Sequence, residues 1–189
     1  MSIIDSESLM KEYDLLIAGN PELRRKAQDV KHVDEEVLQL FRDMIHVMRR
    51  DEGFGLAATQ IGVHKRVIVL DCSESYLPGN GYMYIVNPKI LWKSEETDVQ
   101  EEACMSVPGL GVPVERSLEI KMLYLDEKNE ERTVHAKDFF ARALQHELDH
   151  LEGKLMIDYL SPLKRKMALK KMQRMTQWKN PDEMNASIK

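Results

Sequence analysis

The chain has 189 residues, of which 43% are hydrophobic and 31% are charged, and this balance is typical of a single globular domain. Its formal net charge of −5 argues against nucleic-acid binding over the whole surface, although a local basic patch remains compatible with it. The chain has only two cysteines, which argues against a disulfide framework, and no apolar run approaches the ~20 residues that span a bilayer. Because residues 1–7 also lack the pattern of a secretory signal, we expect a cytoplasmic protein.

The first predicted elements are a short helical turn at residues 21–24 and a long helix over residues 34–50. Asp34 is suited to cap the long helix, and Glu35 and Glu36 suit its first turn. Six apolar side chains recur there at helical spacing and predict a buried face: Val37, Leu40, Phe41, Met44, Ile45 and Met48. A glycine-rich turn at residues 53–60 follows, and the apolar run over residues 66–72 predicts a buried strand.

The middle of the chain is predicted to be mainly extended. A loop is expected at residues 78–81, followed by a strand over residues 84–92, in which Pro88 requires an edge or a bulge. Residues 106–113 contain two prolines and two glycines, and we expect them to be irregular. Residues 118–125 alternate like a half-buried strand, and residues 126–129 predict a hairpin turn into residues 132–134.

Two helices are predicted at the C-terminal end. The first covers residues 138–151 and is closed by Gly153, and the second begins at Ser161 and Pro162 and runs to about Trp178. Residues 180–189 are polar and are expected to fray. Strands grouped in the middle, with helices around them, predict an α+β domain.

The motif H-E-x-x-H at residues 146–150 carries the strongest chemical signal. Two histidines four residues apart lie on one face of a helix, so His146 and His150 can bind one metal ion. A bound metal lowers the pKa of its water to about 7, and Glu147 is placed to take that proton. The pattern therefore predicts a metal-dependent hydrolase, against the alternative of a buried helix whose polar residues have other partners.

The third metal ligand must come from elsewhere. Met156 stands where the metzincin pattern requires a histidine, and no acid downstream has a suitable spacing. The ligand is therefore expected upstream, where a cysteine thiolate suits zinc or iron(II). Cys72 ends an apolar strand and is best interpreted as a buried thiol, which leaves Cys104 as the candidate.

The glycine-rich segment allows two interpretations. Residues 53–55 could form only a helix end and a turn, or the glycines could let a substrate backbone approach closely. In the second interpretation, the side-chain amide of Gln60 can donate to a developing oxyanion.

Three segments together resemble the motifs of peptide deformylases, in the same order. That family carries G-x-G-L-A-A-x-Q, E-G-C-L-S and Q-H-E-x-D-H-L-x-G. This chain has G-F-G-L-A-A-T-Q at residues 53–60, E-A-C-M-S at residues 102–106 and Q-H-E-L-D-H-L-E-G at residues 145–153. The resemblance implies one α+β domain over residues 1–179, with mixed or antiparallel sheets around a central metal-binding helix and with a C-terminal helix.

The second motif departs from the family at two positions. Met105 replaces leucine, which conserves volume and should matter little. Ala103 replaces glycine, which would be costly if this position requires a positive φ. The alternative function is therefore a catalytically weak deformylase-like protein that binds peptide or the ribosome.

The resemblance also implies roles for individual residues. Three residues would bind the metal: Cys104, His146 and His150. Three residues would act on the substrate, one as the proton carrier and two as oxyanion donors: Glu147, the Gln60 side chain and the Met105 backbone N–H. Four residues would line the methionine pocket: Phe54, Gly55, Ala143 and His146. Glu102 and Arg116 would pair beside Cys104.

By the same resemblance, the cofactor is one divalent ion, Fe²⁺, with Zn²⁺, Ni²⁺ or Co²⁺ as substitutes. The substrates are the N-formylmethionyl ends of nascent peptides, and formate is released. The chain resembles the class that ends in a helix, which can dock on the ribosome, and six basic residues occur there: Lys164, Arg165, Lys166, Lys170, Lys171 and Arg174. A solvated surface explains these charges equally well. We expect a monomer that binds neither DNA nor a membrane.

Overall fold

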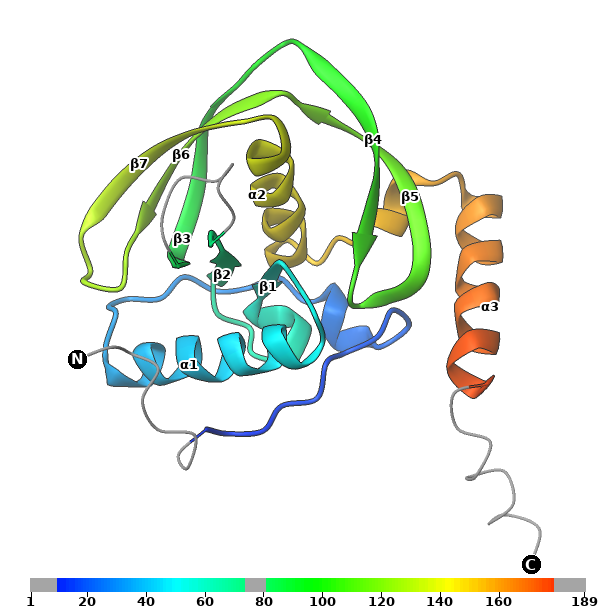
Figure 1. The fold of residues 1–189 in the computed structure, drawn as a ribbon, viewed down its shortest axis with the longest axis horizontal. Helices are drawn as coiled ribbons and strands as arrows, with labels where there is room; N and C mark the ends of the chain where they lie inside the picture. The colour runs from blue at the N-terminus through cyan, green and yellow to red at the C-terminus, as the bar shows by residue number, and fades with distance from the viewer. Residues whose placement is uncertain (1–9, 74–80, 179–189) are drawn as a thin grey trace, which may run out of the picture.

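The structure is a computed structural model that describes residues 10–73 and 81–178. Within these ranges the chain forms a five-stranded sheet, a two-stranded sheet and three α-helices (Figure 1), so the predicted α+β class is confirmed. Every pair of neighbouring strands is antiparallel. The expected tail at residues 180–189 and most of the loop expected at residues 78–81 lie outside the described residues.

The larger sheet has the strand order β1-β2-β3-β6-β7. Its strands have these bounds: β1 Gly55–Ala57, β2 Val67–Asp71, β3 Tyr82–Lys93, β6 Glu119–Leu125 and β7 Glu131–Lys137. The strands predicted at residues 66–72, 84–92 and 118–125 are confirmed, and so is the hairpin between β6 and β7. Part of the predicted glycine-rich turn is in fact β1, which pairs with β2.

Strand β2 is buried on both faces, which explains its continuous apolar run. Val67 and Val69 belong to the hydrophobic core on the side of α1, whereas Ile68 and Leu70 belong to the core on the side of α2. The sheet therefore separates the two helices and fixes their positions.

Strand β3 contains the bulge that Pro88 predicts. Its pairing with β6 changes register between Val86 and Lys89, and Asn87 has a φ of 50°. The Asn87 side chain accepts a hydrogen bond from the Val30 N–H at 2.8 Å and donates one to the Val30 carbonyl at 2.7 Å. The bulge lets a proline lie in an inner strand and ties the N-terminal segment to the sheet.

The smaller sheet corrects one prediction. Residues 106–113 are not irregular, because β5 (Val107–Ser117) pairs with β4 (Thr97–Cys104) along most of its length. A strand in a two-stranded sheet has a partner on one side only, so its other edge tolerates residues such as Pro108 and Pro113 that lack an N–H donor.

Helix α1 (Glu35–Arg50) agrees with its prediction. The Asp34 side chain accepts a hydrogen bond from the Val37 N–H at 3.1 Å, as a capping residue does. All six predicted core residues of this helix are buried.

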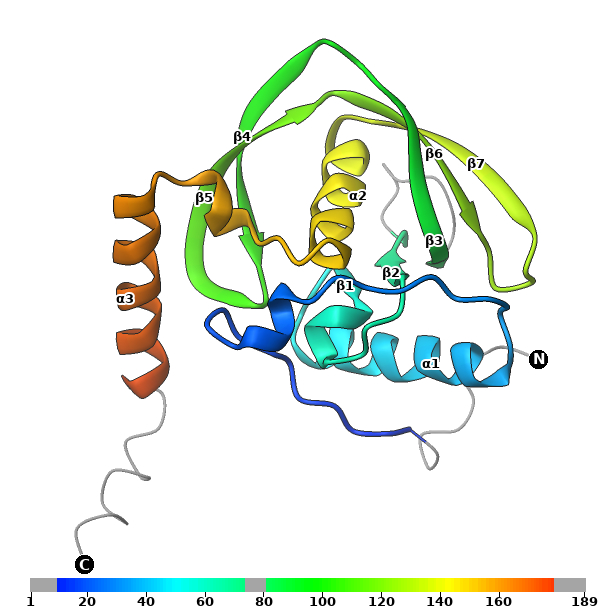
Figure 2. The ribbon, with the colours of Figure 1, turned by 180° about the vertical axis from the view of Figure 1, so that it is seen from behind.

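Helix α2 (Asp138–Leu151) lies between the larger sheet and the β4–β5 hairpin in both views (Figures 1 and 2). It is followed by Gly153, whose φ of +72° suits the end of a helix. Helix α3 (Pro162–Trp178) lies beside β5 at the edge of the molecule, where Met172 is buried against the residues of β5. Among the described residues, no helix is both long and apolar enough to cross a membrane.

Candidate metal centre and active-site cleft

Strand β4 and helix α2 bring three possible metal ligands together. The Nε2 atoms of His146 and His150 are 3.2 Å apart, and the Sγ atom of Cys104 lies 3.4 Å from Nε2 of His150. The ligand atoms of these three residues all lie within 4.8 Å of one another. Cys72 is not part of this group, and burial raises the pKa of its thiol to about 11.

The spacing of the three donor atoms fits a metal ion. Bonds of about 2.1 Å to nitrogen and about 2.3 Å to sulfur place neighbouring ligand atoms of a tetrahedral ion about 3.3–3.6 Å apart. The two measured distances of 3.2 Å and 3.4 Å are close to this range. Two imidazoles and one thiolate leave the fourth position of such an ion for another ligand.

Glu102 orients one of the two imidazoles. Its Oε2 atom lies 2.9 Å from Nδ1 of His146, and Arg116 donates two hydrogen bonds to its carboxylate, at 2.9 Å and 3.0 Å. Burial alone would raise the pKa of Glu102, but the hydrogen bonds from His146 and Arg116 outweigh it and hold that pKa at about 2. A charged carboxylate can only accept, so Nδ1 of His146 donates, and Nε2 is the atom of this ring that can bind a metal.

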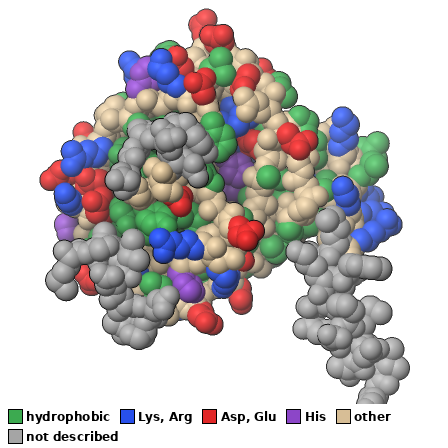
Figure 3. All heavy atoms as spheres, viewed as in Figure 1, with side chains coloured by type: hydrophobic (Ala, Val, Ile, Leu, Met, Phe, Trp, Pro, Cys, Tyr) green, Lys and Arg blue, Asp and Glu red, His purple; other side chains and the backbone are tan. Residues whose placement is uncertain are grey.

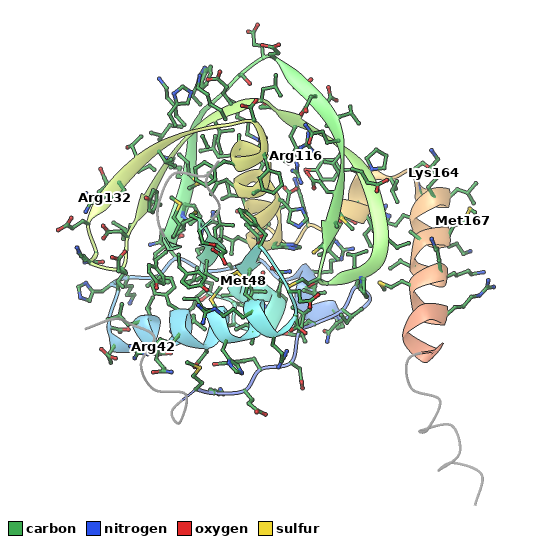
Figure 4. All side chains as sticks on the ribbon, in the orientation of Figure 1. Arg42, Met48, Arg116, Arg132, Lys164 and Met167 are labelled. Carbon is green, nitrogen blue, oxygen red and sulfur yellow. The ribbon has the colours of Figure 1, made fainter. Side chains whose placement is uncertain are left out.

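The network continues on both sides of Glu102. Arg116 also donates to Asp149 at 2.6 Å and lies between α2 and the β4–β5 hairpin (Figure 4). Arg142 donates to Glu102 at 2.9 Å and to Asp98 at 2.6 Å. Glu102 and Arg116 were predicted from the sequence, whereas Arg142 was not, although its position four residues before His146 places it on the same helix face.

Glu147 contributes a buried carboxyl group to the site. Its side chain is almost completely buried, and within the described part of the chain its Oε2 atom has no hydrogen-bond partner. Burial is the main cause that raises the pKa of Glu147 to about 7. The charge of His146 acts to lower this pKa, and the charge of Glu102 acts to raise it further. Gly55 leaves room for this carboxylate, because a Cβ atom at that position would lie 2.6 Å from Oε1 of Glu147.

Gln60 is held firmly beside Cys104. It lies in a short 3₁₀ turn, Ala58–Ile61, and its Oε1 atom accepts a hydrogen bond from the Ala57 N–H at 2.8 Å. Its Nε2 atom donates to the hydroxyl of Ser106 at 3.1 Å and lies 3.8 Å from Sγ of Cys104. The sequence analysis did not single out Ser106, although it lies in the second motif.

Six of these residues line one cleft of roughly 450 Å³: Gln60, Glu102, Cys104, Arg142, His146 and Glu147. The four residues predicted to bind substrate all line it: Phe54, Gly55, Ala143 and His146. Its wall also includes apolar residues that the sequence analysis missed: Val107, Leu110 and Phe139. The rings of Phe54 and Phe139 meet at a centroid distance of 5.1 Å. The cleft therefore has an apolar wall next to the three possible metal ligands.

Met105 and Ala103 also line this cleft. The Met105 side chain lies over Gly53, where an added Cβ atom would be 2.2 Å from its sulfur. Ala103 does not belong to the described residues that have a positive φ. The backbone strain considered in the sequence analysis is therefore absent at this alanine.

The chain resembles known proteins along most of its length. A family model described as polypeptide deformylase matches residues 12–166. The chain is 42% identical to a peptide deformylase of Pseudoalteromonas translucida, over 87% of this chain and 96% of that protein. It is 44% identical to one of Phenylobacterium zucineum, over 85% of this chain and 95% of that protein.

Solved structures of peptide deformylases also match the chain over most of its length. The crystal structure of a peptide deformylase from Ehrlichia chaffeensis matches with a TM-score of 0.84 and 33% identity, over 89% of this chain and 99% of that chain. A second structure of that organism's enzyme, in complex with actinonin, matches with a TM-score of 0.82 and 36% identity, over 88% and 98% of the two chains.

Proposed function

The chain belongs to the polypeptide deformylase family and is a hydrolase that removes the formyl group from N-formylmethionyl peptides, and from this premise we propose that Glu147 moves the proton in the reaction. The observation that carries the proposal is the buried Oε2 atom of Glu147, which has no hydrogen-bond partner among the described residues, in a side chain that lines the cleft together with Cys104 and His146. A carboxyl group with a pKa of about 7 can both accept and release a proton at neutral pH.

The family depends on a metal, and Cys104, His146 and His150 are the residues that would hold it. A bound ion would supply Lewis-acid chemistry, making water a stronger nucleophile and the formyl carbon a better electrophile. We propose Fe²⁺ as the ion, while Zn²⁺, Ni²⁺ and Co²⁺ suit the same set of one thiolate and two imidazoles.

The protein's own groups account for the remaining steps. Glu147 takes a proton from water as the water oxygen attacks the formyl carbon. The Gln60 side chain and the N–H of Met105 donate to the formyl oxygen as negative charge develops on it. When the carbon–nitrogen bond breaks, Glu147 gives its proton to the leaving amine, and formate and a free amino terminus are released.

The apolar wall of the cleft is suited to the methionine side chain. Phe54 and Ala143 line the cleft together with His146, and the ring of Phe139 packs against that of Phe54. Burial of a methionine side chain contributes about 1.5–3 kcal/mol to binding, so this contact can select the first residue. The alternative of a catalytically weak protein that only binds peptide or the ribosome rested on strain at Ala103, and the absence of a positive φ there removes its physical reason.

The test is Glu147→Gln, which keeps the size of the side chain but cannot carry the proton. We expect release of formate from formyl-Met-Ala-Ser to fall by about 10²–10⁴-fold with metal content unchanged. Formate and bound metal are measured on the same loaded samples. If the variant released formate as fast as the parent protein, Glu147 would not be the proton carrier.

Three further properties belong to this proposal. We propose that the protein works as a monomer in the cytoplasm and that α3 docks on the ribosome. The support for docking is the exposure of four lysines on α3: Lys164, Lys166, Lys170 and Lys171. In Figure 4, Lys164 and Met167 of α3 point away from the body of the molecule.

A further inference from the structure

A second pocket lies where α3 begins. This junction pocket has a volume of roughly 510 Å³ and is lined by residues from four segments of the chain: Arg24, Lys154, Asp158, Tyr159 and Arg165. None of these residues belongs to the lining of the cleft that holds the candidate metal centre. What the junction pocket binds is therefore a separate question from the removal of the formyl group.

The backbone holds two arginines at this pocket. Gly153, which follows α2, packs against the 3₁₀ turn Pro21–Arg24, because an added Cβ atom at Gly153 would lie 2.4 Å from the Arg24 carbonyl oxygen. The Arg24 side chain in turn donates to the Gly153 carbonyl at 3.3 Å. Arg165 lies in the first turns of α3, where its N–H donates to the Ser161 carbonyl at 2.8 Å. The two side chains thus come to the pocket from opposite ends of the sequence.

Asp158 lies between the two guanidinium groups. Its carboxylate accepts hydrogen bonds from Nη1 of Arg24, from Nη1 of Arg165 at 2.9 Å and from the Leu155 N–H at 2.9 Å. Burial acts to raise the pKa of Asp158, but the hydrogen bonds from Arg24, the Leu155 N–H and Arg165 outweigh it and lower that pKa. Asp158 is therefore a charged carboxylate that fixes both arginines in place.

The junction pocket keeps an excess of positive charge. Asp158 is the one acid among the described residues of its lining, and it faces three cations. Arg24 and Arg165 bond to described residues only through Nη1, which leaves Nε and Nη2 of both guanidinium groups to donate to a ligand. Lys154 is exposed, and its side chain forms no ion pair or hydrogen bond within the described part of the chain.

These donors suit a phosphate group. The planar guanidinium groups of Arg24 and Arg165 match the spacing of phosphate oxygens, and the Lys154 ammonium adds a mobile third cation. Helix α3 contributes further, because its first turn contains no acidic residue and the N-terminal end of a helix carries partial positive charge. Figure 3 shows Lys and Arg side chains gathered over α3 at the right of the view, and such a surface attracts polyanions.

We propose that the junction pocket binds a phosphate group through Arg24, Lys154 and Arg165. Inorganic phosphate and the backbone of RNA present the same oxygens to these donors, so either can supply the group. The bound phosphate neutralises the charge that Asp158 leaves uncompensated. Because the pocket and the cleft share no lining residue, binding does not require the deformylase reaction.

The experiment is equilibrium dialysis of the metal-loaded protein at constant ionic strength, with labelled orthophosphate and, separately, with a labelled oligouridylate. We expect saturable binding of about one orthophosphate per protein. Lys154→Gln removes a charge without breaking a contact to a described residue and should weaken binding of both probes by about fivefold. Lys154→Glu reverses the charge and should weaken binding by about 25-fold. The probe that binds more tightly identifies the source of the phosphate.

The matched control is Lys89→Gln, which removes the charge of an exposed lysine of β3 outside the pocket and should leave both affinities unchanged. All three variants should release formate from formyl-Met-Ala-Ser as fast as the parent protein, which shows that they fold. If neither probe bound saturably, the proposal would be overturned. It would also be overturned if Lys154→Glu bound both probes like the parent protein, since the phosphate would then lie elsewhere, such as at the metal.

Discussion

At the scale of single residues, Glu102 links the candidate metal site to the fold. It lies in β4, and its carboxylate accepts hydrogen bonds from Arg116 of β5 and from Arg142 and His146 of α2. A buried charge is tolerated only where such partners compensate its loss of water. Removing this carboxylate would leave each of two buried guanidinium groups with only one of its two carboxylate partners, so one side chain affects both stability and the orientation of a possible metal ligand.

The pKa of Glu102 gives its contribution a defined pH range. Because that pKa is about 2 in the folded protein and 4.5 in a model compound, the carboxylate stabilises the fold above pH 4.5. This contribution is lost as the pH falls from about 4.5 toward 2. We expect Glu102→Gln to lower the free energy of unfolding by about 3–5 kcal/mol at pH 7 and to weaken its dependence on pH below 4.5.

Urea denaturation of metal-free protein at several pH values measures both effects. Glu101→Gln, which removes the neighbouring but exposed carboxylate, is the control and should change the unfolding free energy by less than about 0.5 kcal/mol. An equal loss of stability in the two variants would show that the Glu102 network is not the cause.

The two cysteines should differ in metal binding. Cys104→Ser replaces a good ligand with a poor one, so we expect it to lose most of the bound metal. Cys72→Ser should keep the metal, because Cys72 lies outside the ligand group and burial keeps its thiol protonated. Metal content per protein, measured after gel filtration, compares the two, and equal content would refute the assignment of Cys104.

At the scale of elements, helices were easier to predict than strands. The stripe that begins at Val37 and the cap at Asp34 located α1, because a long amphipathic helix repeats its signal several times. Strand β1 has only three residues, which is too short to show a period. Strands β4 and β5 obtain their hydrogen bonds from each other, and that pairing is not visible in a segment containing Pro108 and Gly109.

The candidate site was also predictable only in part: its possible metal ligands were found from the sequence, but some of the residues that hold them in place were not. The possible ligands are carried by short motifs, so their residue types and spacing reveal them. The contacts of Arg142 join β4, β5 and α2, and those of Ser106 reach Gln60 from another segment. Contacts over such separations follow from the tertiary fold and have no local pattern.

Strand β4 also supplies the next prediction, at Ala103. Since Ala103 has no positive φ, Ala103→Gly relieves no strain and adds conformational freedom to the unfolded chain. We expect the free energy of unfolding to fall by about 0.5–1 kcal/mol, and kcat/KM for formyl-Met-Ala-Ser to stay within about twofold. A large gain in activity would instead support the interpretation of the natural protein as a weak enzyme.

At the scale of the whole molecule, charge is unevenly distributed. The net charge is −5, whereas residues 159–181 contain no acidic residue and many basic ones. The positive charges gather on α3, which lies at one edge of the molecule (Figures 1 and 2). A surface of this kind can bind a polyanion although the whole protein is acidic.

Neutralising this helix tests ribosome docking. Four exposed lysines are changed to glutamine: Lys164, Lys166, Lys170 and Lys171. We expect affinity for ribosomes in a sedimentation assay at low salt to fall by about tenfold or more, with hydrolysis of free peptides unchanged. The control changes four exposed lysines elsewhere: Lys89, Lys93, Lys121 and Lys128. If both variants lost affinity equally, total charge and not α3 would explain the binding.

Gly55 has a consequence for drug resistance. A Cβ atom at this position would lie 2.6 Å from both Oε1 of Glu147 and Cδ2 of Leu70, so a substitution here should displace the carboxylate that the reaction needs. An inhibitor that rests on the backbone of Gly55 therefore contacts a surface that substitution can change only at a cost to activity. Resistance should arise instead at residues such as Phe139, which lines the same cleft and is 43% exposed.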